Sequence, residues 1–316
     1  IGTGGSAIVA KTLGEGKTEK ANEYFSMLVY ITAIGGIIIA ILSMFLVKPV
    51  AILFGANGAL LDNCILYGRI LCISLPAFML QNVFQSFFVT AEKPHLGLRV
   101  IVIAGVTNMV LDFLFVAVLH FGLPGAGFAT VCGEFIGGLF PLFYFGRKNS
   151  SLLKLGKTHF HGRILLKTCT NGSSELMTNL SSSIVNALYN MQLMKFAGED
   201  GVAAYGTIMY VNFIFVSIFL GYAIGSAPIV SYHYGAGNQD ELKNLFLKSI
   251  RLIGTWAVSL FVIAQLIATP LATLFVGYDH GLFELTRNGF RLYSFAFLIN
   301  GFNIYGSAFF TALNNG

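Results

Sequence analysis

The chain has 316 residues, of which 55% are hydrophobic and only 10% are charged, and its mean hydropathy is +0.75. Soluble domains carry about 25% charged residues, so this composition argues against a soluble protein and favours one surrounded by lipid. The formal net charge of +5 does not predict a nucleic-acid partner, because the cations lie in loops beside apolar segments. The four cysteines fall in or beside apolar segments, which predicts neither disulfides nor a zinc site.

Apolar segments follow one another along the whole chain, separated by polar or proline-containing turns. Residues 1–12 have the character of the end of a membrane span. The later segments reach or exceed the ~20 residues that an α-helix needs to cross a bilayer. We therefore expect an all-α integral membrane protein. The predicted spans are residues 24–47, 64–91, 96–119, 125–145, 164–196, 202–232, 245–268 and 283–312.

An internal repeat relates the two halves of the sequence. Residues 4–16 read GGSAIVAKTLGEG, and residues 225–237, 221 positions later, read GSAPIVSYHYGAG. The same shift aligns further identical residues: Phe25 with Phe246, Pro49 with Pro270, Asn82 with Asn303, Ser86 with Ser307 and Thr90 with Thr311. The shift covers six helices, an even number, which predicts two bundles in one orientation related by a pseudo-two-fold axis along the membrane normal.

The repeat also predicts how much of the protein this chain covers. Residues 97–146 and 164–195 have counterparts only outside positions 1–316. We therefore expect a longer protein of twelve transmembrane helices in two six-helix bundles, about ten of which are represented here.

Basic residues are unevenly distributed between the two sides of the predicted membrane. Fourteen of the 19 Lys and Arg residues fall on the side that includes residues 147–163, which the positive-inside rule places in the cytoplasm. This pattern predicts a first lobe over 1–146, a basic cytoplasmic connector over 147–163 and a second lobe over 164–316. Leu152, Leu153 and Leu155 lie among cations and predict a short interfacial helix in the connector.

Polar residues occur inside two consecutive predicted spans. Asn108 and Asp112 are four residues apart, so both lie on one helix face. Counted from the turn between the spans, Thr130 should lie at the depth of Asp112, and Glu134 at the depth of Asn108. Ionisable groups at membrane depth are costly and mark functional sites, and such oxygen ligands suit Na⁺ or a proton on the carboxylate. The alternative is hydrogen bonding that only holds two helices together.

The start of the second lobe is unusually polar for a membrane span. Residues 168–190 are rich in Ser, Thr and Asn, so this helix should line a water-filled cavity. Glu175 is its one carboxylate, and Asn179 follows one turn later. Glu175 is either a second ion-coupling group or an acid that lines the cavity.

Two spans carry matching polar stripes. Gln81 and Gln85 in one, and Asn300 and Asn303 in the other, are spaced for a single helix face. Together with Glu134 and Asn179 they are the predicted residues of a substrate cavity. Aromatic residues stand beside both stripes: Phe84, Phe87, Phe88, Phe302, Tyr305 and Phe309. Such a surface suits a bulky amphipathic cation, although helix packing explains the same pattern.

The sequence contains no enzyme signature. Gly-x-Ser-x-Gly, a phosphate-binding loop and His-Glu-x-x-His are all absent. His159 and His161 in the connector have no evident third ligand, so no metal site is predicted beyond Na⁺ at Asn108, Asp112 and Thr130. We expect a protein that is not an enzyme and needs no cofactor.

Several stretches resemble the MATE (multidrug and toxic compound extrusion) transporters: the two repeat copies, the run NMVLD that holds Asn108 and Asp112, and GLPGAGFATV, which holds Thr130. The resemblance covers most of that family's second to tenth helices and is nearest its bacterial branch. It implies Na⁺- or H⁺-coupled export by alternating access. In some members an Asn-x-x-x-Asp pair and a Thr bind the cation with an Asp on the first helix, and others use an acid on the seventh helix, which falls on Glu175 here.

The sequence therefore predicts a monomeric, multi-pass antiporter of the bacterial inner membrane. It would be coupled to Na⁺ or H⁺ and would export small amphipathic, cationic compounds. The alternatives left open are a lipid-linked oligosaccharide flippase on a related scaffold, which needs a strongly cationic cavity, and a channel.

Overall fold

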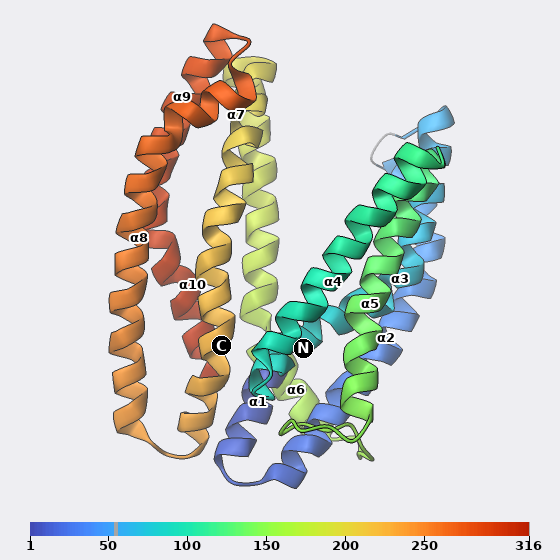
Figure 1. Ribbon diagram of the computed structural model, residues 1–316, viewed down its shortest axis with the longest axis vertical. Helices are drawn as coiled ribbons and strands as arrows, with labels where there is room; N and C mark the ends of the chain where they lie inside the picture. The colour runs from blue at the N-terminus through green and yellow to red at the C-terminus, as the bar shows by residue number, and fades with distance from the viewer. Residues whose placement is uncertain (54–55, 316) are drawn as a thin grey trace. The chain divides into compact units, whose positions relative to one another are not determined.

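The computed structural model describes residues 1–53 and 56–315, which form helices, short turns and one extended connector (Figure 1). The part of the chain described contains no β-strand. The chain divides into two compact units, residues 1–169 and 170–316, and the boundary lies inside the predicted span 164–196. The helices of the first unit are α1 (Gly2–Gly14), α2 (Thr18–Leu53), α3 (Gly58–Thr90), α4 (Pro94–Asp112), the π-helix η1 (Phe113–Val118) and α5 (Gly122–Gly146).

The second unit is also helical. Its first helix, α7 (Ser173–Gly235), is a pair of helices in one run, because Gly198 has a non-helical backbone (φ 61°, ψ −151°). The remaining elements are α8 (Gln239–Val276), α9 (His280–Tyr293), the 3₁₀ turn η2 (Ser294–Ala296) and α10 (Phe297–Ala312), while α6 (Gly162–Asn171) crosses the unit boundary.

Seven helical runs among the described residues are long and apolar enough to cross a membrane. One of them, residues 162–235, contains two of the predicted spans, one on each side of Gly198. Large apolar side chains remain exposed on these helices, for example Ile34, Ile38 and Phe45 on α2. An apolar outer surface of this extent is expected where lipid is the solvent, so the prediction of an all-α membrane fold is confirmed.

The predicted span 164–196 is not one continuous helix. It begins as α6 and restarts as α7 after Gly172, whose backbone (φ −87°, ψ 1°) is outside the helical range. Glu175, expected deep inside that span, therefore lies in the first turn of α7 and is exposed. Below it, Asn171 donates to the Thr311 carbonyl (2.8 Å) and ties this start to α10.

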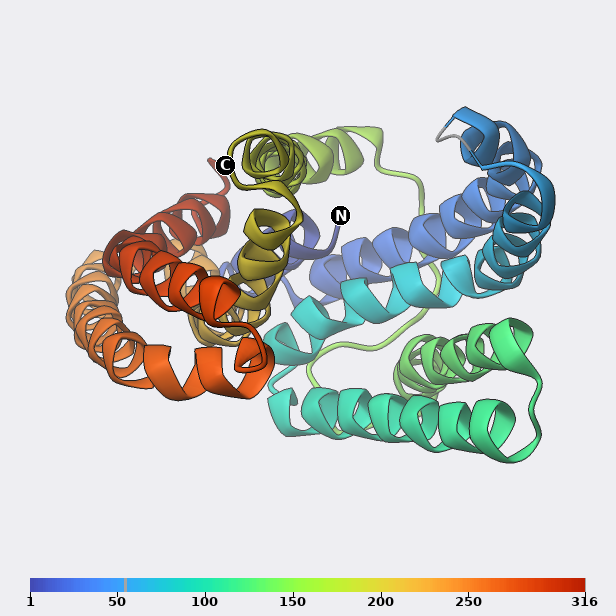
Figure 2. The same ribbon diagram turned by 90° about the horizontal axis from the view of Figure 1, so that it is seen from above.

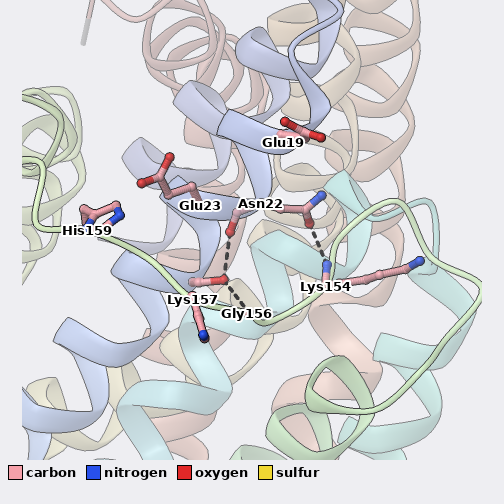
Figure 3. Close-up of a pocket in the computed structure, with 8 residues that line it drawn as sticks. Glu19, Asn22, Glu23, Lys154, Gly156, Lys157 and His159 are labelled. Carbon is pink, nitrogen blue, oxygen red and sulfur yellow. Dashed lines mark hydrogen bonds between the residues drawn. The ribbon is translucent and has the colours of Figure 1, made fainter.

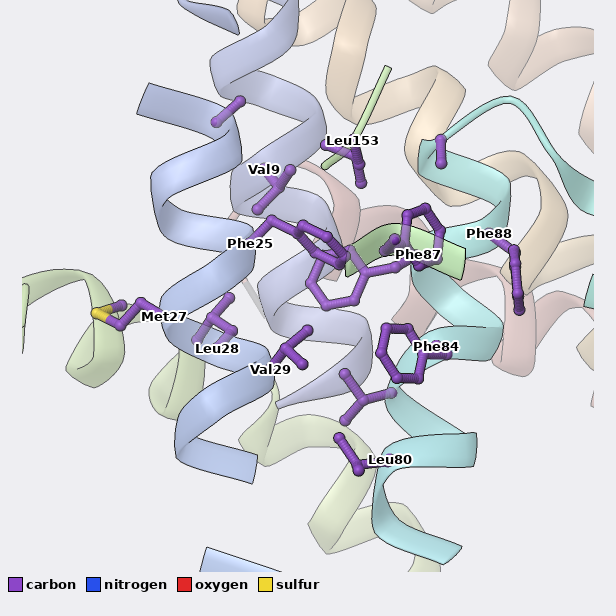
Figure 4. Close-up of a cluster of buried hydrophobic side chains, with 14 of the residues drawn as sticks. Val9, Phe25, Met27, Leu28, Val29, Leu80, Phe84, Phe87, Phe88 and Leu153 are labelled. Atoms are coloured by element: carbon purple, nitrogen blue, oxygen red, sulfur yellow. The ribbon is translucent and has the colours of Figure 1, made fainter. Parts of the chain in front are cut away.

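The core of the first unit is aromatic (Figure 4). Phe25 of α2 packs edge-on against Phe87 of α3 and Phe145 of α5, with ring centroids 4.8 and 5.2 Å apart. Phe84 and Phe88 are also buried in this cluster. Of the two interpretations left open for the phenylalanines of α3, the structure supports helix packing, because they face inward between helices. Tyr305 of α10 is likewise buried in the core of the second unit.

The connector is extended and contains no helix before Gly162. Its predicted interfacial helix is wrong for a physical reason. Leu153 is fully buried in the aromatic core, and the Leu155 N–H donates to the Phe145 carbonyl (2.9 Å) at the end of α5. Leu153 is therefore held in the protein core and Leu155 is partly buried, while Leu152 is exposed, so the three leucines do not form one apolar stripe of a helix.

Candidate functional site

The most concentrated group of predicted site residues lies where α3, α4 and α5 pack together. Seen from above, α4 and α5 lie side by side, and α5 also packs along α3 (Figure 2). Glycines on α5 make this close approach possible. A Cβ at Gly133 would lie 3.0 Å from the Ala104 carbonyl oxygen of α4, and one at Gly138 would collide with the Ala77 carbonyl of α3. Small residues let membrane helices approach closely, so side chains near them meet across the seams.

Asn108 and Thr130 meet across the seam between α4 and α5. The Asn108 Nδ2 donates to Thr130 Oγ1 at 3.4 Å, and the Thr130 hydroxyl donates to the Ala126 carbonyl of its own helix at 3.1 Å. These two hydrogen bonds fix the orientation of the Asn108 amide, and its Oδ1 is left available as an acceptor. The structure thus joins Thr130 to Asn108, whereas equal depths had predicted Asp112 as its neighbour.

Asp112 is the last residue of α4, and the π-helix η1 begins directly after it. Its carboxylate is half-buried and makes no side-chain hydrogen bond or ion pair among the described residues. Asp112 lies one helical turn beyond Asn108 on the same face of α4. π-Helical turns are rare and occur frequently at functional sites. This position therefore leaves a carboxylate and the Asn108 amide oxygen available to a ligand.

Glu134 and Gln81 lie in the seam between α3 and α5. Glu134 was predicted beside Asn108, and in the structure its carboxyl group also lies near Ser74 of α3, whose hydroxyl donates to the Leu71 carbonyl of its own helix (3.1 Å). Gln81 packs against Gly137, and its Oε1 is buried without a hydrogen-bond partner in the part of the chain described. The seam thus holds a carboxylate near a hydroxyl, and an amide oxygen that lacks a donor among the described residues.

The other predicted cavity residues are less enclosed. Gln85 is half-buried on α3. In the second unit, Asn179 and Asn303 are exposed and Asn300 is half-buried, on α7 and α10, which pack together. Glu175 belongs to the same unit as these three asparagines. The structure therefore gathers Gln81, Asn108, Thr130 and Glu134 around α5 and leaves the second-unit residues as a separate set.

Sequence reasoning missed several residues of these sites. Ser74 of α3 was not singled out. Nor were Gly133, Gly137 and Gly138 of α5, although their spacing places small residues where α5 packs on α3 and α4. In the second unit, Tyr205 donates to Asn186 Oδ1 at 2.6 Å and stacks on the Tyr189 ring, with centroids 5.4 Å apart. This contact links the two halves of α7 on either side of Gly198. The sequence signal for it was Tyr205, in the span that follows Asn186.

The side chains of the first-unit group offer oxygen atoms and no positive charge. Its side chains offer two carboxylates, two amides and two hydroxyls, and none carries a positive charge: Ser74, Gln81, Asn108, Asp112, Thr130 and Glu134. Hard cations such as Na⁺ prefer such oxygen ligands. Among the described residues, no group of three or more His, Cys, Asp or Glu side chains is arranged to hold a metal ion.

A family model described as MatE matches residues 1–114 and 176–316 of this chain. The chain belongs to the MatE family. The two matched segments include both copies of the sequence repeat and the Asn108–Asp112 pair of this MatE chain. Membership and the apolar helices together identify an integral membrane protein.

Relatives of this MatE chain include proteins named as exporters or transporters. It is 21% identical over 278 residues to the multidrug export protein MepA of Staphylococcus saprophyticus, covering 88% of this chain and 60% of the relative. The MepA of Staphylococcus haemolyticus is 24% identical over 77% of this chain and 54% of the relative. A FAD transporter of Shewanella oneidensis is 21% identical over 87% of this chain and 62% of that protein. The chain thus spans between half and two thirds of these relatives.

Solved structures share the fold. A multidrug resistance MATE family transporter in an outward-facing conformation superposes with a TM-score of 0.93 at 22% identity, over 100% of this chain and 70% of that one. A MATE crystal structure in the straight conformation gives a TM-score of 0.92 at 21% identity over the same shares. At this identity the likeness concerns the fold alone.

Proposed function

We propose that this protein is a cation-coupled antiporter that exports small amphipathic, cationic compounds across the bacterial inner membrane, with its connector on the cytoplasmic side. MatE membership and relatives named multidrug export proteins support transport of this class. The twelve-helix, two-bundle architecture predicted by the repeat belongs to the same proposal.

The observation that carries the proposal is the hydrogen bond between Asn108 and Thr130 one helical turn from the Asp112 carboxylate. Because Asn108 donates with its Nδ2, its Oδ1 remains free to face a cation. Asp112, on the same helix face, supplies the negative charge. These two oxygens bind Na⁺, or Asp112 alone carries a proton. Placing a cation there offsets the cost of an ionised carboxylate at membrane depth.

Substrate recognition falls to the neighbouring seam. Glu134 makes no ion pair with a Lys, Arg or His side chain among the described residues, and Gln81 Oε1 has no donor. A protonated amine is a donor that carries positive charge, so it is the kind of group that either oxygen acceptor would bind. Gln85 extends this surface along α3. The second unit carries its own polar residues for the same task, Asn179, Asn300 and Asn303, with Glu175 as a second acid.

Coupling follows if the ion and the substrate compete. Both sites use α5, through Thr130 in one seam and Glu134 in the other. A bound ion would disfavour a second positive charge so close, and alternating access would then exchange one cation for the other across the membrane.

The test is transport by the full-length protein in proteoliposomes with an imposed Na⁺ or pH gradient. The Asp112→Asn variant keeps the shape of the side chain and removes its charge, so gradient-driven export of an organic cation should fall at least about tenfold. Asp62→Asn is the matched control, because Asp62 is an exposed carboxylate near the start of α3. Export that stays fully coupled in Asp112→Asn contradicts the proposal.

The same assay distinguishes the two alternatives. A flippase for lipid-linked oligosaccharides needs cations for phosphate, and the residues around α5 supply carboxylates and amides. Its signature would be lipid translocation that is unaffected by Asp112→Asn. A channel would give conductance without exchange, which reversal potentials reveal.

A further inference from the structure

The extended connector runs along one face of α2 and is bound to it residue by residue (Figure 3). The Asn22 side chain accepts from the Lys154 N–H (2.7 Å) and donates to the Leu152 carbonyl (3.4 Å). One turn along α2, Ser26 Oγ accepts from the Gly156 N–H (3.0 Å). One turn further, the Tyr30 hydroxyl donates to the Gly156 carbonyl (3.2 Å).

The two segments match in their repeat distances. Four residues of an α-helix rise about 6 Å, and two residues of extended chain span about 6.6 Å. Asn22 and Ser26 are four residues apart, and Lys154 and Gly156 are two residues apart. A helix with polar side chains at this interval can therefore bind the backbone of an extended segment, much as a neighbouring strand does.

A second row of contacts fixes the end of the connector. The Thr158 hydroxyl donates to the Glu23 carbonyl (2.8 Å), and His161 Nε2 lies 3.0 Å from Glu23 Oε1. The His161 ring also packs edge-on against Tyr24, with centroids 5.2 Å apart. Near the start of the bound segment, Leu153 is buried in the core beside Val9 and Phe25 (Figure 4). Hydrogen bonds hold the segment along its length, and apolar burial anchors its start.

These contacts are not a general property of the repeat. The α8 positions that correspond to Asn22, Ser26 and Tyr30 are occupied by Lys243, Leu247 and Arg251. These side chains cannot reproduce the pattern, because Leu247 has no polar group and the other two offer donors only. The polar face of α2 is therefore specific to the helix that carries the connector.

We propose that residues 152–161 are a fixed strap that stays on α2 while the transporter changes conformation. The strap then moves as part of the first unit, which extends through Cys169, so the link between the units begins only after the strap and not at the start of the predicted 17-residue connector. This inference does not depend on which substrate is transported.

A covalent bridge between the strap and α2 tests this directly. In the full-length protein with Cys64, Cys72, Cys132 and Cys169 replaced, Ser26→Cys and Gly156→Cys are introduced together. The Ser26 hydroxyl lies 3.0 Å from the Gly156 nitrogen, whereas a Cβ at Gly156 meets no atom within 4 Å, so a short bismaleimide, which bridges thiols that are not in disulfide contact, joins the pair. We expect near-complete cross-linking, with export within about twofold of the same variant before cross-linking. Loss of export on cross-linking, or failure to cross-link, overturns the proposal.

Limited proteolysis gives a second readout that needs no transport activity. Trypsin cleaves after Lys154 and Lys157, and a bound strap protects both sites. The double variant Asn22→Ala, Ser26→Ala should be cut at least about tenfold faster at these lysines. The repeat-equivalent variant Lys243→Ala, Leu247→Ala should be cut like the wild type. Equal cleavage in all three proteins overturns the strap. A wild type that exports nothing, yet cross-links and resists trypsin, contradicts only the proposed function.

Discussion

The turn between α1 and α2 and its counterpart between α7 and α8 have nearly the same backbone. Gly16 and Gly237 both have positive φ, 76° and 71°. The Lys17 N–H donates to the Thr12 carbonyl (3.1 Å), and the equivalent Asn238 N–H donates to the His233 carbonyl (3.0 Å). Both are Schellman-type helix ends, in which a glycine in the left-handed conformation closes the helix. The local sequence is enough to reproduce this geometry twice.

Further along the repeat the two copies differ. Phe25 is fully buried among three aromatic rings, whereas Phe246 is 39% exposed and contacts one ring, that of Phe309. The helix α3 runs unbroken through Pro76, but its counterpart is divided into α9, η2 and α10. The comparison shows that the local sequence determines the turn geometry, while side-chain packing depends on which helices surround each copy of the repeat.

The largest test of this difference is truncation of the equivalent phenylalanines. Phe25→Ala removes the centre of the aromatic core and should cost about 3–5 kcal/mol of unfolding free energy. Phe246→Ala should cost much less, since that ring is partly exposed. SDS titration of the purified protein in mixed micelles, followed by circular dichroism, gives both values. Equal costs would show that the copies are packed alike after all.

Glycine-mediated helix contacts provide the next comparison. An Ala at Gly138 would collide with the Ala77 backbone, whereas at Gly301 it would meet the side chains of Phe219 and Ile253. Backbone shifts less easily than side chains, so Gly138→Ala should cost about 1–3 kcal/mol and Gly301→Ala less. The same titration measures both. A larger cost for Gly301→Ala would contradict the difference in seam tightness.

The two turn glycines should behave alike. Gly16→Ala and Gly237→Ala each force a side chain into positive φ, with no neighbour within 4 Å at either site. Each should therefore cost about 1–2 kcal/mol through backbone strain alone. Thermal unfolding of the two variants should shift by similar amounts. A clear difference would mean that tertiary contacts also act on these turns.

The smallest expected effect comes from one buried hydrogen bond in the second copy. Ser231 donates to the Ala312 carbonyl (2.7 Å), and the equivalent position in the first copy is Ala10. Ser231→Ala should cost about 0.6 kcal/mol, typical of hydrogen bonds between membrane helices. Ser226→Ala is the control, because that hydroxyl bonds only within its own helix. Indistinguishable unfolding midpoints would show that the bond contributes nothing.

The membrane spans and the repeated turn could be predicted because each depends on neighbouring residues: apolar length in one case and a glycine after a helix in the other. The predictions that were wrong or left open concern features that depend on tertiary packing. Leu153 and Phe84 have side chains that suit either lipid or a protein core, and only the packed helices show that both are buried. The composition predicted one continuous helix, but the helix is interrupted at Gly172. Glu175 therefore lies in the first turn of α7.

The candidate site was predicted in part. The spacing of Asn108 and Asp112 placed them on one face, and the next span supplied Thr130. Thr130 contacts Asn108 and not Asp112 because of the way α4 and α5 cross. Glycines such as Gly133 permit this crossing, and helical periodicity does not predict it. Glu134 and Ser74 come close although they are sixty positions apart in the sequence, so no local pattern predicts their proximity.

By itself, the sequence determined the membrane character, the helical segments and the duplicated turn, because lipid requires backbone hydrogen bonds to close within each segment. The tertiary structure decided where the polar side chains go. In a bilayer, apolar side chains gain little free energy by packing against protein in place of lipid. Close helix approach at glycines and hydrogen bonds between helices therefore decide which helices pack together. The pairing of Asn108 with Thr130 and the binding of the connector to Asn22 and Ser26 are both outcomes of that selection.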